Sequence, residues 1–364
     1  MKSTAFALVA MLLAMPLLLR AADSASAPPS GEAASAQDRS SDSAKGRSKA
    51  PGIARQFALK FAQLAAKGGK AAKAPPAPPP DKADLAYGSH PNQRIDLWLA
   101  KTERPAPLAI FIHGGGFIGG DKSRISGEVV KELLAAGVSV AAINYRFRTE
   151  VPLPVILRDS ARALQFLRSK ADEFGVDKTR VACFGGSAGA GTSLWLAFRD
   201  DLADPQSEDP VARESTRISA AAATGCQATY DITKWPEILG SDDVLRFYPE
   251  TDAPAFYGFK STEELHTEAG RKVLADVDML GMVSSDDPPV WLSSSDRHDA
   301  LANRGDVNHA ARHAIAVQQR CQEVGVPVVL KIGEAVRGEG ESSQVDFMLK
   351  HLGVKLPADE KAAK

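Results

Sequence analysis

The chain has 364 residues, and its 44 Lys and Arg nearly balance its 45 Asp and Glu, so the net charge is −1. This balance gives no basic surface of the kind that binds nucleic acid. Cys183, Cys226 and Cys321 form neither an even disulfide set nor a zinc-binding spacing, and no cluster of His, Asp and Glu has metal-ligand spacing. We therefore expect no metal and no cofactor, and we expect Cys183 and Cys226 to be buried thiols.

The N-terminus is predicted to direct export. Lys2 followed by the apolar run 5–19 is typical of a secretory signal peptide, which we assign to residues 1–22. Cleavage is expected among the small residues of 21–27. A retained membrane anchor is the alternative, but the run is short for a spanning helix. The protein is thus expected to be secreted or periplasmic.

Residues 23–80 are predicted to be a disordered, low-complexity linker. The segment is rich in Ser, Ala, Asp and Lys up to about residue 50 and in Pro at 74–80, so it cannot bury enough apolar surface to fold. Within it, residues 53–67 carry apolar side chains at helical spacing among basic ones. Such a segment could contact a membrane surface weakly, although a transient helix in a tail is the interpretation we favour.

Residues 81–356 are predicted to form one α/β domain, followed by a disordered tail at 357–364. Strands alternate with helices, which is typical of a mostly parallel sheet with crossover helices. The final helix is expected at 342–352. A stretch without a clean period, 227–287, is rich in aromatic residues. The expected strands are 94–100, 108–112, 138–145, 179–184, 218–224, 289–292 and 328–332.

A serine follows one of these strands in a Gly-x-Ser-x-Gly setting. Gly185, Ser187 and Gly189 have the spacing of a nucleophile elbow, in which a serine sits on a tight strand-to-helix turn with its hydroxyl exposed. The glycines prevent a clash where the strand and helix approach each other. The helix N-terminus also places backbone N–H groups and partial positive charge beside the serine. Because this motif also occurs by chance, the neighbouring sequence must indicate whether Ser187 is a nucleophile.

A second motif lies earlier in the chain. The strand at 108–112 runs directly into His113, Gly114, Gly115 and Gly116. A strand that ends in H-G-G-G is typical of the oxyanion-hole loop of lipases and esterases. The amides of Gly114 and Gly115, with that of Ala188 at the elbow, are the predicted oxyanion hole. The alternative is a glycine-rich loop and an unrelated serine turn, which the order of the two motifs disfavours.

On these motifs the chain resembles the α/β-hydrolase fold over about residues 85–354. It is most similar to the H-G-G-G carboxylesterase branch, which includes hormone-sensitive-lipase-like and feruloyl-esterase-like enzymes. The resemblance implies helices on both faces of the sheet and an insertion after strand six, here 227–287, that often carries a lid or the acyl-side wall. It also implies a serine esterase that acts on a small-molecule ester. The elbow departs from the family in lacking Asp before Ser187 and Gly-Gly after it.

A serine nucleophile needs a base and an orienting acid, which follow it in the chain order Ser, acid, His. The strand at 289–292 leads to Asp296, which resembles the family's acid. Asp299 is the alternative acid. Either aspartate could instead be a solvated or capping residue.

The histidine is not where the resemblance places it. The window 333–340 contains none, and Arg337 stands at the expected position, where a guanidinium cannot accept a proton. His309 opens the helix after the acid loop on the elbow side, so it is the candidate base, although it could merely begin a surface helix. The remaining histidines are given less weight: His90, His113, His266, His298, His313 and His351.

Two functions remain open. In the first, the protein is an exported serine esterase with Ser187 as nucleophile, Asp296 as acid and His309 as base. In the second, the fold is retained but the triad is broken at Arg337, which leaves a protein that binds a small molecule or carbohydrate ester. The intact elbow and H-G-G-G loop favour the first. The sequence does not identify the ester.

Overall fold

The computed structural model describes residues 75–248, 252–295, 301–337 and 340–354. Several predictions fall on other residues: the signal peptide, the segment at 53–67, Asp296, Asp299 and the tail at 357–364. Among the described residues, no helix has the length and apolar character needed to span a bilayer.

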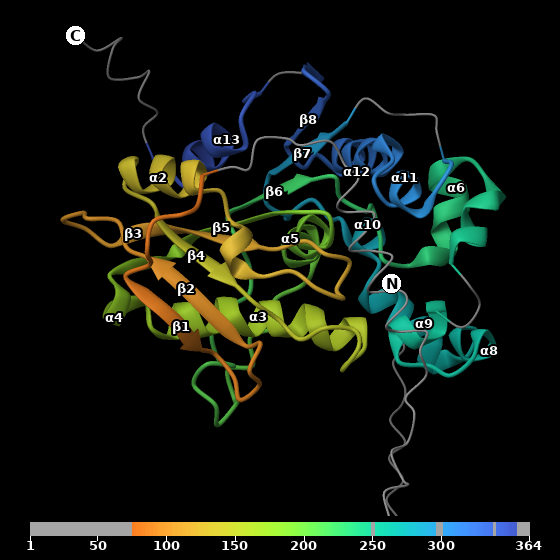
Figure 1. The fold of residues 1–364 in the computed structure, drawn as a ribbon, viewed down its shortest axis with the longest axis horizontal. Helices are drawn as coiled ribbons and strands as arrows, with labels where there is room; N and C mark the ends of the chain where they lie inside the picture. Colours follow the sequence, from red (N-terminus) through yellow and green to blue (C-terminus); the bar gives the residue numbers. More distant parts are fainter. Residues whose placement is uncertain (1–74, 249–251, 296–300, 338–339, 355–364) are drawn as a thin grey trace, which may run out of the picture. The chain divides into compact units, whose positions relative to one another are not determined.

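The described chain is built around one sheet of nine strands in the order β1-β2-β4-β3-β5-β6-β7-β8-β9 (Figure 1). Strands β4, β3, β5, β6, β7 and β8 pair in parallel, whereas β1, β2 and β9 pair antiparallel at the two edges. The bounds are β1 Lys82–Ala86, β2 Arg94–Trp98, β3 Ala106–Ile112, β4 Ser139–Ile143, β5 Val176–Gly186, β6 Ala220–Thr224, β7 Val290–Ser294, β8 Val328–Ile332 and β9 Ala335–Arg337.

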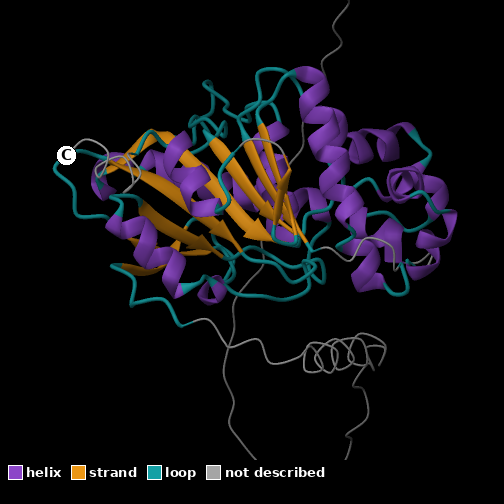
Figure 2. Ribbon diagram, turned by 90° about the horizontal axis from the view of Figure 1, so that it is seen from above, coloured by secondary structure: helices purple, strands orange, loops and turns teal. Residues whose placement is uncertain are grey.

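Helices cover both faces of this sheet (Figure 2). On one face, α2 (Gly127–Ala135) and α13 (Gln344–His351) bury apolar side chains. On the other lie α3 (Leu153–Ser169), α5 (Ala188–Phe198) and α12 (Ala311–Val324), with the short α4 (Ala171–Phe174) after α3. Central strands such as β4 are apolar and buried along their whole length, as expected for strands covered on both faces. The predicted α/β fold class is therefore confirmed.

The insertion between β6 and β7 is made of short helices. They are η2 (Ile232–Lys234), α6 (Trp235–Leu239), η3 (Asp242–Phe247), α7 (Asp252–Tyr257), α8 (Thr262–Leu265), α9 (Glu268–Asp276) and α10 (Met279–Met282). Their shortness explains why the sequence has no clean period there. Trp235, Leu239 and Val244 of this insertion form a small core with Val307 and Ala310. The insertion thereby supports α11 (Arg304–Asn308), which lies between β7 and α12.

Residues 75–80, which the sequence places at the end of the linker, contact the domain. Pro75 O accepts a hydrogen bond from Gly127 N at 3.1 Å, and Pro78 O accepts one from Trp98 Nε1 at 2.7 Å. Ala77 packs against the core beneath α2. These backbone acceptors attach residues 75–80 to the domain, although their proline content is typical of a linker.

Candidate active site

The turn after β5 has the geometry of a nucleophile elbow. Ser187 has φ 54° and ψ −120°, a strained conformation for a residue with a side chain. A Cβ at Gly185 would lie 2.3 Å from Ile112 O, and one at Gly189 would lie 1.9 Å from the same atom. Both positions must therefore be glycine, because the end of β3 passes against them. Ser187 N donates to Thr224 O at 2.9 Å, which ties the turn to the end of β6.

The H-G-G-G loop crosses directly over this turn. A Cβ at Gly114 would lie 2.5 Å from Gly186 O and 3.4 Å from Ser187 Cβ. Gly115 has φ +128°, which favours glycine. Within the described part of the chain, the amides of Gly114 and Gly115 have no acceptor. Ala188, the third predicted donor, begins α5 beside them. The structure thus brings Gly114 and Ala188, two of the predicted oxyanion donors, next to Ser187.

His113 supports this loop from within the core. Its ring is fully buried and stacks on Tyr145 at a centroid distance of 4.2 Å. Tyr145 also donates its hydroxyl hydrogen to His113 O at 2.6 Å. Burial lowers the pKa of His113 to about 4, so the ring is neutral at ordinary pH. This placement gives His113 a structural function in the loop.

The structure brings His309 to Ser187. His309 follows α11 directly, and its Nε2 lies 2.8 Å from Ser187 Oγ. Its Nδ1 lies 3.0 Å from Gly305 O, which can only accept, so the proton belongs on Nδ1. The lone pair of Nε2 therefore faces the serine hydroxyl. This is the tautomer that a general base requires.

The protonation of His309 also suits a base. Desolvation by the surrounding protein lowers the pKa of His309 below its ordinary value, although the ring stays accessible to solvent. The Gly305 carbonyl and the charge of Asp306 oppose this shift. Because desolvation is the largest effect, the imidazole is mostly neutral at pH 7 and can accept a proton.

Among the described residues, the partner of His309 Nδ1 is a backbone carbonyl and not a carboxylate. Asp306 lies three residues earlier, where its carboxylate accepts a hydrogen bond from Asn303 Nδ2 at 2.6 Å. Asp296 and Asp299 lie outside the described residues, so the assignment of the acid stays a prediction. Asp306 was not among the predicted site residues, although Asn303 and Asp306 have the spacing of a helix cap before His309.

In the window 333–340, the described residues 333–337 form the turn and the second strand of a β-hairpin with β8. Its strand β9 pairs antiparallel with β8, and Arg337 lies opposite Leu330 at the exposed edge of the sheet. Gly333 makes the turn with φ +57°. The side chain at the Ser187 hydroxyl is that of His309, whereas Arg337 lies on the edge strand β9.

Aromatic side chains pack beside the oxyanion loop. The Phe117 ring lies 5.4 Å from that of Tyr230 and 6.1 Å from that of Phe256, which belongs to α7 of the insertion. Tyr230 donates its hydroxyl hydrogen to Ala188 O at 2.9 Å. The insertion thus contributes apolar rings near the elbow, in agreement with its expected position by the acyl side.

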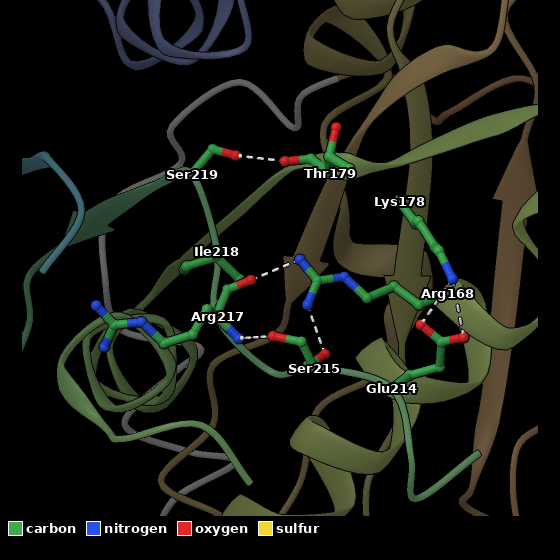
Figure 3. Close-up of a pocket in the computed structure, with 8 residues that line it drawn as sticks. All are labelled: Arg168, Lys178, Thr179, Glu214, Ser215, Arg217, Ile218 and Ser219. Atoms are coloured by element: carbon green, nitrogen blue, oxygen red, sulfur yellow. Dashed lines mark hydrogen bonds and ion pairs between the residues drawn. The ribbon is translucent and has the colours of Figure 1, made fainter. Parts of the chain in front are cut away.

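Figure 3 shows residues that line a cavity of about 370 Å³, none of which is a predicted site residue. Lys178 and Thr179, which help to line it, are near the start of β5, whereas Ser187 follows the end of that strand. Lys178 pairs with Glu214 at 3.1 Å, and Arg168 donates to the carbonyls of Ser215 and Arg217 (Figure 3). These pairings indicate a structural function for the charged side chains.

The sheet order, the elbow and the H-G-G-G loop together define an α/β-hydrolase. The BD-FAE family model matches residues 95–299, more than half of the chain, and the chain belongs to this family of hormone-sensitive-lipase-like α/β-hydrolases. The resemblance inferred from the motifs is therefore confirmed.

Relatives found by sequence comparison are named as esterases or carboxylic ester hydrolases. Esterase LipC of Mycobacterium tuberculosis is 31% identical over 149 residues, which cover 40% of this chain and 36% of that protein. The probable carboxylic ester hydrolase LipM of the same organism is 27% identical over 272 residues, which cover 66% of this chain and 61% of LipM. The chain thus spans less than two thirds of either relative.

Solved structures show the same fold at low identity. A truncated carbohydrate esterase from gut microbiota has a TM-score of 0.59 at 16% identity, with 77% of this chain and 100% of that chain covered. An acetyl ester-xyloside bifunctional hydrolase from Caldicellulosiruptor lactoaceticus has a TM-score of 0.53 at 19% identity, with 70% and 86% covered.

Proposed function

We propose that the protein is a serine-dependent carboxylic ester hydrolase with Ser187 as nucleophile and His309 as general base. The observation that carries the proposal is the 2.8 Å contact between Ser187 Oγ and His309 Nε2, made at a strained turn beneath the H-G-G-G loop. The names of the relatives, which are esterases and ester hydrolases, support the same class of enzyme.

In the proposed mechanism, His309 Nε2 takes the hydroxyl proton as Ser187 Oγ attacks the ester carbonyl carbon. The negative charge that develops on the carbonyl oxygen is stabilised by the amides of Gly114, Gly115 and Ala188. The imidazolium then returns the proton to the departing alcohol. Water, activated by the same ring, cleaves the acyl-enzyme and frees Ser187.

The positive charge on His309 has to be stabilised while the tetrahedral intermediate exists. The Gly305 carbonyl accepts the Nδ1 hydrogen in both states of the ring, and Asp306 adds a favourable charge. We assign the role of the triad acid to Asp296, with Asp299 as the alternative. A catalytically degenerate binding protein, the alternative function, would lack a base beside Ser187, so the 2.8 Å contact of His309 Nε2 with Ser187 Oγ favours the esterase.

The substrate is proposed to be a small-molecule ester, with its acyl group against the aromatic rings of Phe117 and Phe256. Lys2 and the apolar run 5–19 support export, so the enzyme is proposed to act outside the cytoplasm. The basic segment at 53–67 would supply at most a weak contact with a membrane surface.

Hydrolysis of short p-nitrophenyl esters tests this proposal. We expect Ser187→Ala to reduce kcat to the background left by the oxyanion hole. The matched control is Ser169→Ala, since Ser169 is a serine remote from the site whose hydroxyl donates to Phe166 O. The control should keep the kcat of the unchanged protein. Equal activity of Ser187→Ala and the unchanged protein would overturn the proposal.

A further inference from the structure

Two buried side chains connect the loop after β6 to α11. Gln227 Nε2 donates to Asn308 O at 2.6 Å. His313, which is fully buried, accepts at Nδ1 from Ala228 N at 3.3 Å, and its Nε2 lies 3.1 Å from Val307 O, to which it donates. We call Gln227 and His313 the β6–α11 clasp. Both side chains cross-link the same two segments at adjacent residues.

The loop held by the clasp is hydrogen-bonded to the serine backbone and passes beside the His309 ring. Thr224 O accepts the hydrogen bond from Ser187 N at 2.9 Å, so the loop begins at the elbow. The next residue, Gly225, has φ +60°, and a Cβ there would lie 3.5 Å from His309 Cδ2. Residues 224–228 therefore connect the backbone of Ser187 to the helix that precedes His309. The clasp attaches the far end of this loop to that helix.

Helix α11 needs such support because it is only five residues long. A helix of this length is not stable by its own hydrogen bonds, so tertiary contacts must hold it. His309 is outside its regular turn, with φ −121° and ψ 19°. A hydrogen bond between Ser187 Oγ and His309 Nε2 requires a separation near 2.8 Å, and a displacement of about 1 Å removes it.

The clasp is itself rigid. The Trp235 ring packs edge-on against His313 at a centroid distance of 4.9 Å, and Trp235 Nε1 donates to Thr229 O at 3.0 Å. Burial lowers the pKa of His313 to about 4, so its ring is neutral at ordinary pH. In the tautomer given by its partners, Nδ1 accepts and Nε2 donates. His313 therefore bridges Ala228 and Val307 over the range of pH in which an esterase would act.

We propose that Gln227 and His313 are positioning residues that hold His309 Nε2 within hydrogen-bond reach of Ser187 Oγ. Neither touches the reacting atoms, and both act through α11. The inference rests on the proposed function, since it concerns the base of that site. It adds to that function a buried polar connection from the elbow to the helix that carries the base.

Gln227→Met tests the clasp, because methionine keeps the length of the side chain but cannot donate to Asn308 O. We expect kcat for p-nitrophenyl acetate to fall by about 10- to 100-fold, as for a reacting group misplaced by about 1 Å, while KM stays within about twofold. The acid limb of the profile of kcat/KM against pH should move up, because a displaced imidazole regains water and its pKa returns toward about 6.5. Asp306, the charged neighbour of His309, is unchanged in this variant.

The matched control is Gln165→Met. Gln165 is also buried, and its Nε2 donates to the backbone carbonyls of Ala212 and Glu214, far from the site. A merely structural loss should lower the melting temperature of both variants without changing kcat or the acid limb of either. For the second member of the clasp, His313→Leu should lower kcat. His313→Gln, which retains a donor and an acceptor, should have a kcat closer to that of the unchanged protein than His313→Leu has.

Titration of His309 by NMR, with ¹³C-labelled histidine and assignment by His309→Ala, separates this inference from the proposed function. If the unchanged protein hydrolyses no ester, the proposed function is overturned, and the NMR titration still decides about the clasp. An upward shift of the His309 pKa in folded Gln227→Met, absent in Gln165→Met, supports the clasp. An unchanged His309 pKa and an unchanged kcat in folded Gln227→Met overturn it, whatever the result for Ser187.

Discussion

Ser187 Oγ and His309 Nε2 lie 2.8 Å apart, although 122 positions separate them in the chain. Their meeting follows from parallel topology. Ser187 follows β5, and the loop after the neighbouring β6 accepts a hydrogen bond from the serine backbone and passes beside the His309 ring. In this chain, the proposed base is therefore supplied by the segment after β7 and not by the segment after β8.

His309→Ala should lower kcat by about three orders of magnitude or more, because it removes the side chain whose Nε2 lies 2.8 Å from Ser187 Oγ. Its melting temperature should stay close to that of the unchanged protein, since the ring is accessible to solvent. Arg337→Ala, on the exposed strand β9, is the control and should keep kcat within about twofold. A larger loss for Arg337→Ala than for His309→Ala would show that the base has been misassigned.

The pH dependence should report the environment of His309. Because desolvation lowers the pKa of His309, activity should persist below the ordinary histidine value of about 6.5 and fall only as the ring becomes protonated. Asp306→Asn removes a charge that raises this pKa, so the acid limb of kcat/KM should move to still lower pH. An upward movement of the limb in Asp306→Asn would contradict the assignment of that limb to His309.

Gly114→Ala should abolish most activity, because its Cβ would lie 2.5 Å from Gly186 O and the loop would have to leave the elbow. The loss of one oxyanion donor alone reduces kcat by about 10²- to 10³-fold. Gly119→Ala is the matched control in the same loop, since a Cβ there meets no atom within 4 Å. Steady-state kinetics on both variants make the comparison. Comparable kcat values for the two would remove Gly114 from the oxyanion hole.

Truncation distinguishes the linker from the domain. Deleting residues 1–74 should leave the melting temperature nearly unchanged, since a Ser- and Ala-rich linker buries little area. Deleting 1–80 should lower it by several degrees, because the hydrogen bonds to Gly127 N and Trp98 Nε1 contribute about 1 kcal/mol each. Differential scanning calorimetry of the two truncated proteins measures the difference. Equal melting temperatures would mean that residues 75–80 contribute nothing.

The parts of the site that are local in sequence could be predicted. Ser187, Gly114 and Gly115 lie just after strands. Glycine is required in these turns because two backbone segments pass close to each other, and the resulting motifs can be recognised in the sequence. The central strands could be found because they are apolar and covered on both faces. The edge strands β1 and β9 were missed, since β1 is mostly exposed and β9 has only three residues.

The tertiary parts of the site could not be read from local patterns. His309 was a candidate only by its place in the chain order, because no local signal reports that Gln227 and His313 hold its helix against the elbow. Residues 75–80 look like a linker in composition, yet their carbonyls serve as acceptors for Gly127 and Trp98. In each case the contact that fixes the position of the residue joins segments that are far apart in sequence.

Covalent modification by a fluorophosphonate, followed by mass spectrometry of the intact protein and its peptides, tests the central claim most directly. The reagent reacts with a serine whose proton is removed by an adjacent base. We predict one adduct per chain at Ser187, none in Ser187→Ala and much slower labelling in His309→Ala, while Ser169→Ala labels normally. An unlabelled protein, or an adduct that persists in Ser187→Ala, would contradict the account.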